Sequence, residues 1–338
     1  MDNLKRKELA AWLYNLILAV AVYIGLSYVL SAGLLSRYWQ GVLMLVFINI
    51  VLAVSLNLVT GFLGQLTLGH AGFMSVGAYT AALMTKNVLP KTLPSLAALL
   101  IAMLVGGLAA ALCGILIGVP ALRLRGDYIA IITLGFGEII RVIVESLTVT
   151  GGAKGLRGIP KLSTLPIAYW TTVLVIACLV ALIHSRHGRA IMSIREDEVA
   201  AEAAGVNTTF YKSLAFVVSA FMAGLGGAIF AHYTGLLGAT TFNFNKSIEI
   251  LVIVVLGGMG SITGSAAAAV VLTLLPELLR GFSDYRMLAY SVLLVVMMIV
   301  KPGGLLGRHE LRLTRLADMV RGRSKKKSQK PGDKEVAS

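Results

Sequence analysis

The chain has 338 residues and a formal net charge of +14, with 57% hydrophobic and only 14% charged residues. The hydrophobic residues lie in long runs, such as WLYNLILAVAVYIGLSYVL at 12–30, that have almost no polar face. A soluble helical protein of this size needs amphipathic helices, so that class is excluded. Because about 20 apolar residues cross the ~30 Å hydrocarbon layer, the runs predict an all-α polytopic membrane protein.

We expect about ten transmembrane helices, some of them broken by glycine motifs. The first run follows three basic residues, Lys5, Arg6 and Lys7, as it would in a signal peptide. It is longer than the apolar region of such a peptide, and we interpret it as an uncleaved span. The predicted spans are 10–32, 39–59, 64–84, 93–118, 127–149, 166–184, 212–236, 246–258, 264–281 and 286–300.

Basic residues outside the runs predict how the chain crosses the membrane. The positive-inside rule puts both termini, Arg123, Arg125 and the 185–212 loop on the cytoplasmic side, and ten spans satisfy this. We expect one transmembrane domain over 1–305. The basic tail, 306–338, lacks the apolar residues that a folded core needs and is expected to be disordered. Beside a span, such a tail more commonly contacts anionic lipid than nucleic acid.

One basic segment does not fit this orientation. Residues 150–161, TGGAKGLRGIPK, carry Lys154, Arg157 and Lys161 on the predicted outer side. Either the positive-inside rule is weak in this loop, or these cations face an acidic partner outside the membrane.

Charged residues within the spans are few, and three of them fall in one span. Glu138, Arg141 and Glu145 are spaced i, i+3 and i+7, which places them along one helical face. A charge near the bilayer centre costs at least about 2.5–3.5 kcal/mol, so these side chains should face protein or water. Two interpretations stay open: a structural ion-pair network, and a part of a translocation path.

Two other classes of function have little support. An ion-coupled secondary carrier would use Glu138 or Glu145 as the titrating group, but acids within the membrane are scarce. No phosphate-binding loop, HExxH motif, GxSxG elbow or Cys/His cluster is present. We therefore expect a protein that is not an enzyme and that binds no metal or cofactor itself.

Two glycine motifs match each other, GFLGQLT at 61–67 and GGMGSIT at 257–263. Interrupted helices in corresponding halves predict a substrate site, because unwound backbone offers polar groups there. Chance similarity is the alternative, and isolated polar residues are more often hydrogen bonded between helices. Whether the motifs are parallel or inverted repeats stays open. The candidate path residues are Asn57, Gly61, Gly64, Gln65, Thr67, Glu138, Gly257, Gly260, Ser261 and Thr263.

The segment IREDEVAAEAAGVN, 194–207, is unusually acidic and rich in alanine. Ser193 and Glu196 form a capping-box pattern, which predicts a water-facing helix over 194–205 that ends at a glycine. Asn207 is a suitable cap for the next span. The helix is either a solvated connector, its acids balanced by nearby cations, or a docking element. The candidate docking residues are Glu198, Ala200, Ala201, Glu202, Ala203, Ala204 and Gly205, and the balancing cations are Arg186, Arg189, Arg195 and Lys212.

Five segments together resemble a known family. They are NLVTGFLGQLTLGHAGFMSVGAYTAAL, LRLRGDYIAIITLGFGEIIRVIVES, TGGAKGLRGIP, REDEVAAEAAGVN and VLGGMGSITG, in this order between about 40 and 305. The pattern resembles branched-chain amino acid ABC importer permeases, and it is closest to the second, M-type permease of such systems.

The resemblance implies a permease subunit of an ATP-driven importer in a bacterial inner membrane. An external binding protein would deliver leucine, isoleucine or valine to this chain and a second permease. Two cytoplasmic ATPase subunits, which bind ATP and Mg, would contact the segment from Glu198 to Gly205. The GG-x-x-G loop, with Gly151, Gly152 and Gly155, would lie outside near the binding protein. Urea and short-chain amide permeases share similar motifs and are the alternative.

Overall fold

The computed structural model describes residues 2–33, 35–90, 92–121, 126, 128–281, 291–292, 295–296, 299–300 and 304. The chain forms two compact units, one of residues 1–34 with 309–338 and one of residues 35–308. The described part of the first unit is helix α1, Asp2–Ser31, which contains the first predicted span. Most of the last predicted span, together with Arg123, Arg125 and the whole tail, lies outside the described residues.

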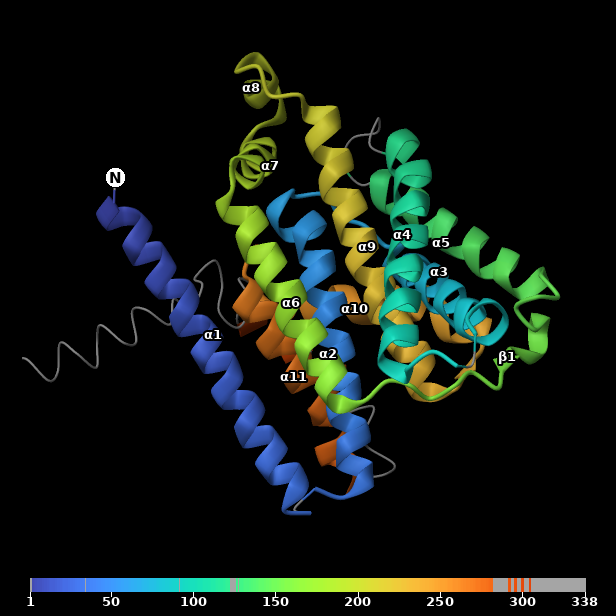
Figure 1. Cartoon of the computed structure of the whole chain (residues 1–338). Helices are drawn as coiled ribbons and strands as arrows, with labels where there is room; N and C mark the ends of the chain where they lie inside the picture. The colour runs from blue at the N-terminus through green and yellow to red at the C-terminus, as the bar shows by residue number, and fades with distance from the viewer. Residues whose placement is uncertain are drawn as a thin grey trace, which may run out of the picture. The chain divides into compact units, whose positions relative to one another are not determined.

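The second unit is built almost entirely of helices (Figure 1). Its elements in chain order are α2 (Arg37–Asn57), the π-helical turn η1 (Leu58–Phe62), α3 (His70–Leu83), η2 (Met84–Val88), α4 (Ser95–Ala121), α5 (Tyr128–Ser146), η3 (Gly152–Lys154), β1 (Leu156–Arg157), α6 (Leu165–His184), α7 (Arg186–Glu196), α8 (Glu198–Ala203), α9 (Thr208–Thr234), β2 (Leu236–Leu237), η4 (Ala239–Phe242), α10 (Phe244–Gly257), α11 (Ile262–Leu278) and η5 (Leu279–Gly281).

Four helical segments in the described residues are long and apolar enough to cross a membrane: Arg37–Phe62, Ser95–Gly118, Leu165–His184 and Thr208–Thr234. They correspond to four of the predicted spans and confirm the class of an all-α membrane protein. The count of ten spans is not confirmed by the described part of the chain.

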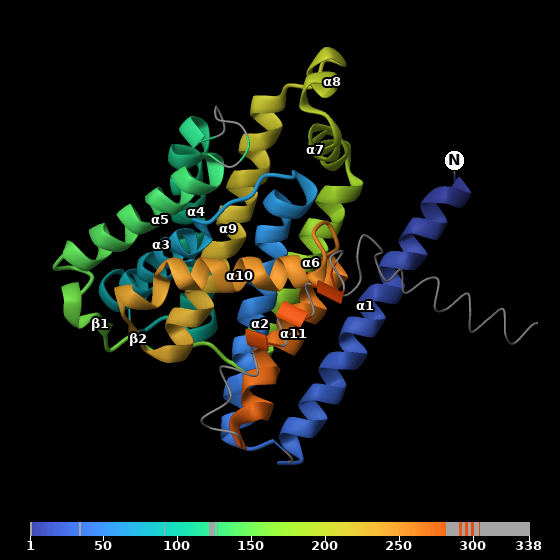
Figure 2. The ribbon, with the colours of Figure 1, turned by 180° about the vertical axis from the view of Figure 1, so that it is seen from behind.

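Helices α3 and α10 are too short to cross the membrane alone. Each has 14 residues, which corresponds to about 21 Å of rise against ~30 Å of hydrocarbon. The predicted span 64–84 was therefore placed too early, because the chain from Leu63 to Gly69 is not helical. Helix α10 crosses α2 instead of running along it (Figure 2). The breaks fall at the two glycine motifs, as predicted.

Helix α9 separates two ends of the second unit. Its 27 residues give about 40 Å of rise, more than the hydrocarbon thickness. Helix α8 comes directly before α9 and strand β2 directly after it. The acidic segment and the loop that pairs with β2 therefore lie at opposite ends of a membrane-spanning helix.

Glycines let helices α3, α4 and α9 pack with their backbones in contact. A Cβ at Gly77 of α3 would overlap the Cα of Gly224 in α9. A Cβ at Gly106 of α4 would lie 2.6 Å from the carbonyl oxygen of Gly77. The three helices meet at these small residues, which lets their backbones pack closely.

We predict that Gly77→Ala lowers the thermal unfolding midpoint in detergent, because overpacking at a backbone contact costs about 1–3 kcal/mol. Gly135→Ala is the matched control, since no heavy atom lies within 4 Å of a Cβ at that helical position. The control should keep or raise the midpoint, because alanine favours helix by up to about 1 kcal/mol over glycine. Equal midpoints for the two variants would contradict the packing described for α3 and α9.

Candidate coupling and translocation site

Helix α8 begins at Glu198, four residues later than predicted, and Asp197 is its N-cap. The Asp197 carboxylate accepts hydrogen bonds from the backbone N–H groups of Val199 and Ala200, at 2.9 and 3.0 Å. Ser193 lies inside α7 and its hydroxyl donates to the Ala190 carbonyl, so the predicted capping box and the continuous helix over 194–205 are wrong. Buried Ile191 and Ile194 hold α7 against the body of the protein and extend that helix to Glu196.

The end of α8 is closed by a glycine, as predicted. Gly205 has φ +84°, and its N–H donates to the Glu202 carbonyl at 2.9 Å. The N–H of Val206 donates to the Ala201 carbonyl at 3.0 Å, which completes a Schellman motif. Asn207 then caps α9 by accepting from the Phe210 N–H. A helix of only six residues is therefore held by caps at both ends.

An ion pair between buried Lys212 and partly exposed Glu198 connects α8 to α9. Lys212 is 3% exposed, and its ammonium group lies 2.7 Å from the Glu198 carboxylate. The sequence predicted Lys212 as one of the cations that balance the acids of this segment, and its ion pair with Glu198 confirms that prediction. Arg189 and Arg195 instead donate to backbone carbonyls, those of His184 and Gly61.

Most of the other residues of α8 are exposed within the described part of the chain. Ala201, one of the predicted docking residues, is only 5% exposed and packs inward, whereas Val199 is 66% exposed. We call the exposed residues of this segment the α8 surface. They are Val199, Ala200, Glu202, Ala203, Ala204 and Gly205.

Asn57 joins the two glycine motifs in space. Its amide nitrogen donates to the Ser261 carbonyl and to the Ser265 hydroxyl, both at 2.9 Å. Its amide oxygen accepts from the Gly260 N–H, also at 2.9 Å. The side chain is fully buried, so this predicted path residue acts as a hydrogen-bonding group between helices.

The glycines of the two motifs allow this contact. A Cβ at Gly61 would overlap both the Asn57 amide and the Gly260 nitrogen. Gly257 packs against Gly264 at the turn between α10 and α11. Gly64 and Gly260, which occupy the same position of the shared motif, both have positive φ, +78° and +88°. We call this arrangement, residues 61–64 with 257–261, the glycine junction.

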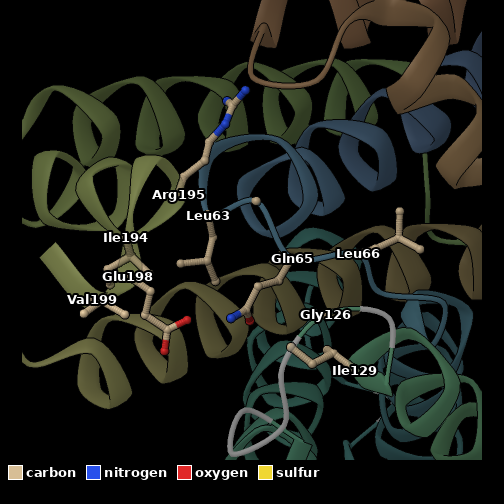
Figure 3. A pocket seen from close by; sticks show the side chains of 10 residues that line it. Leu63, Gln65, Leu66, Gly126, Ile129, Ile194, Arg195, Glu198 and Val199 are labelled. Carbon is tan, nitrogen blue, oxygen red and sulfur yellow. The ribbon is translucent and has the colours of Figure 1, made fainter. Parts of the chain in front are cut away.

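A pocket of about 320 Å³ lies between the glycine junction and the acidic segment (Figure 3). The Arg195 guanidinium points away from the Glu198 carboxylate in this view. Arg195 was predicted only as a balancing cation, and no sequence pattern indicated its contact with the junction. The residues that line the pocket are Leu63, Gly64, Gln65, Leu66, Gly126, Ile129, Ile194, Arg195, Glu198 and Val199.

The other predicted path residues of the motifs have different surroundings. The side-chain oxygen of Gln65 is buried and has no hydrogen-bond partner among the described residues. Thr67 is buried in the linker before α3. Thr263 lies in the first turn of α11, with its hydroxyl 3.4 Å from that of Ser261, which caps the helix. Of these three, only Gln65 lines the pocket.

The three charged residues of α5 form the predicted ion-pair network. The Arg141 guanidinium lies 2.6 Å from the Glu138 carboxylate and 2.9 Å from that of Glu145. The second oxygen of Glu138 accepts from the Phe244 N–H at the start of α10, at 3.1 Å. Asn243 also lines the open hollow of about 290 Å³ beside Glu138 and Arg141. The side chains of Glu138, Arg141 and Glu145 are 25–38% exposed. The ion-pair network and a role of this face of α5 in a translocation path are therefore compatible.

The GG-x-x-G loop lies at the end of α9 opposite α8. Gly151, Gly152 and Gly155 have positive φ of +85°, +57° and +75°, which positions β1 against β2. The two strands pair antiparallel, with Leu156 opposite Leu237. The three cations of this segment, Lys154, Arg157 and Lys161, are exposed.

These features define a class: a polytopic helical membrane protein with broken helices and a short capped helix between two long ones. A family model described as "Branched-chain amino acid transport system / permease component" matches residues 38–301. The chain therefore belongs to this family of transport permeases. No solved structure is significantly similar to it.

Individual relatives agree with the family. The chain is 37% identical over 308 residues to the high-affinity branched-chain amino acid transport system permease protein LivM of Salmonella typhimurium, covering 81% of this chain and 71% of the relative. It is 38% identical over 315 residues to LivM of Escherichia coli K12, with the same coverage. It is 28% identical over 155 residues to LivH of Escherichia coli K12, covering 45% of this chain and 50% of the relative. The similarity to an M-type permease, predicted from the motifs, is confirmed.

We predict that Asn57→Ala lowers the unfolding midpoint and the folded yield more than Asn49→Ala does. Both residues are buried in α2, but among the described residues the Asn49 side chain makes one hydrogen bond, from its amide nitrogen to the Thr273 hydroxyl at 2.9 Å. Removing the Asn57 side chain leaves three partner groups without their bonds, two in the glycine junction and the Ser265 hydroxyl in α11, and each unpaired buried group costs about 1–3 kcal/mol. Equal losses in thermal unfolding would contradict the central position given to Asn57.

Proposed function

We propose that the chain is the M-type permease subunit of an ATP-driven importer of branched-chain amino acids. The family match over residues 38–301 supports the transport class, and the names of the LivM relatives support leucine, isoleucine and valine as substrates. The observation that carries the coupling role is the α8 surface, a capped and exposed helix at one end of the membrane-spanning α9.

The α8 surface is the docking site for a cytoplasmic ATPase subunit. The helix is rigid because its two ends are capped and Glu198 pairs with buried Lys212. Small alanine side chains let a partner groove approach the backbone closely, and Glu202 offers a charge to a basic partner. ATP and Mg belong to the two ATPase subunits, so hydrolysis is carried out by partner chains.

The exposed face of α5 borders the translocation path and faces a second permease. Its ion network is only partly buried, and charges at this depth need protein or water around them. The similarity to both LivM and LivH supports a partner permease of the H type. On the outer side, the exposed cations at 154, 157 and 161 suit an acidic surface of the external binding protein.

The first test of this function is uptake by the whole importer in proteoliposomes. With the second permease, two ATPase subunits and the binding protein, the chain should import radiolabelled leucine only when ATP is supplied. Excess unlabelled valine should reduce the uptake of leucine, whereas excess urea or acetamide should not. Uptake by this chain alone along a proton or sodium gradient would contradict the proposal, as would competition by urea.

A second test concerns the docking of ATPase subunits on the α8 surface. Gly205→Leu should abolish ATPase copurification, because φ +84° is strained for leucine and the cap of α8 is lost. Gly158→Leu is the matched control, since Gly158 also has positive φ, +75°, and open space around it. Retention of the ATPase subunits by Gly205→Leu, or their equal loss in the control, would contradict docking at α8.

A third test concerns orientation, with cysteine labelling after Cys113→Ser and Cys178→Ser. A membrane-impermeant maleimide should label Lys154→Cys in intact spheroplasts, because the GG-x-x-G loop is proposed to lie outside. Ala200→Cys, on the α8 surface, should be labelled only after the membrane is opened. The opposite pattern would reverse the proposed orientation.

A further inference from the structure

Arg195 connects the segment next to the α8 surface with the glycine junction. It lies in the last turn of α7, two residues before the Asp197 cap of α8. Its guanidinium donates a hydrogen bond to the carbonyl oxygen of Gly61, 134 residues away in the sequence. This contact crosses from the segment outside the membrane to the end of the buried α2.

The Gly61 carbonyl needs a partner that the helix cannot supply. Helix α2 and η1 end here, with the N–H groups of Leu63 and Gln65 donating to Leu58 and Val59. Carbonyls in the last turn of a helix lack intrahelical donors and carry the negative end of the helix dipole. The Arg195 guanidinium donates a hydrogen bond to the Gly61 carbonyl and places a positive charge at the negative end of the helix dipole.

The two equivalent glycines of the motifs make room for the Arg195 side chain. A Cβ at Gly64 would lie 2.9 Å from the Arg195 Cγ. A Cβ at Gly260 would lie 2.7 Å from the Arg195 Nη1. The side chain therefore passes between both glycine turns, one after α2 and one after α10. Any larger residue at 64 or 260 would displace it.

We propose that Arg195 is a positioning residue that transmits movement of α7 and α8 to the glycine junction, and so couples the ATPase subunits to the translocation path. This inference rests on the proposed function. Buried Ile194 and the capped α8 make the segment rigid on one side of Arg195. Asn57 fastens the two glycine turns to each other on the other side. A displacement of α8 then moves the ends of α2 and α10 together.

The test is transport by the complete importer in proteoliposomes with Arg195→Gln. We expect normal assembly and continued ATP hydrolysis, while the leucine imported per ATP hydrolysed falls by about tenfold, within the usual range of coupling between sites. Arg195→Lys should give an intermediate ratio, because an ammonium keeps the charge and one donor but loses the planar fork. An unchanged ratio in Arg195→Gln would overturn the proposal.

Arg189→Gln is the matched control for this substitution. Arg189 lies on the same helix and also donates to a helix-end carbonyl, that of His184 at 3.2 Å, but it does not reach the junction. The control should keep the wild-type ratio of leucine to ATP, and an equal fall in both variants would overturn the role of Arg195. A parallel loss of assembly and transport would also overturn it, because that result indicates a structural role. Failure of the wild-type importer to use ATP for uptake would instead contradict the proposed function.

A double-mutant cycle keeps the test valid if Arg195→Gln folds poorly. Gly64→Ala should reduce the ratio strongly when Arg195 is present, since the added Cβ displaces its stem. In an Arg195→Ala background the same change should have little further effect, while its backbone strain is common to both backgrounds. Additive effects of the two changes would show that Gly64 and Arg195 do not act through each other.

Discussion

The structure depends on the hydrogen bonds of Asn57 between the end of α2 and the turn from α10 to α11. Two groups of that turn and the Ser265 hydroxyl of α11, 203 to 208 residues away in the sequence, are hydrogen bonded to this one buried amide. Helix α10 is too short to span the membrane, so its end needs a partner within the protein. Because Gly61 and Gly260 carry no side chains, the two turns come close enough for one amide to join them.

Arg195, at the end of α7, reaches the same turns. Arg195 lies close to Gly64 and Gly260 and donates to Gly61, so two side chains, Asn57 and Arg195, contact one junction. A membrane helix that is broken at such a point can change its direction with little loss of packing elsewhere. In the proposed coupling mechanism, this hydrogen-bonded junction and the capped segment that contacts it move together.

Local patterns in the sequence predicted the helical class, the breaks at both glycine motifs and the cap at Gly205, because each depends on neighbouring residues. The start of α8 was predicted wrongly: Ser193 and Glu196 have the right spacing for a cap, but burial of Ile194 extends α7 past them. The contact of Arg195 with Gly61 was not predicted, because the sequence indicated Arg195 only as a balancing cation. Its partner lies 134 residues away, and no local periodicity records such a contact.

The most direct measurement of the central claim is a distance between two spin labels, at Ala203→Cys on the α8 surface and Met259→Cys in the turn before α11, after replacement of Cys113 and Cys178. Both positions are exposed, Met259 by 44%. If Arg195 makes helices α7 and α8 move together with the glycine junction, the distance between the two labels is the same in nucleotide-free and ATP-trapped importers. With Arg195→Gln, the distribution of distances should broaden. A distance between the labels that changes with nucleotide while Arg195 is present would contradict the account.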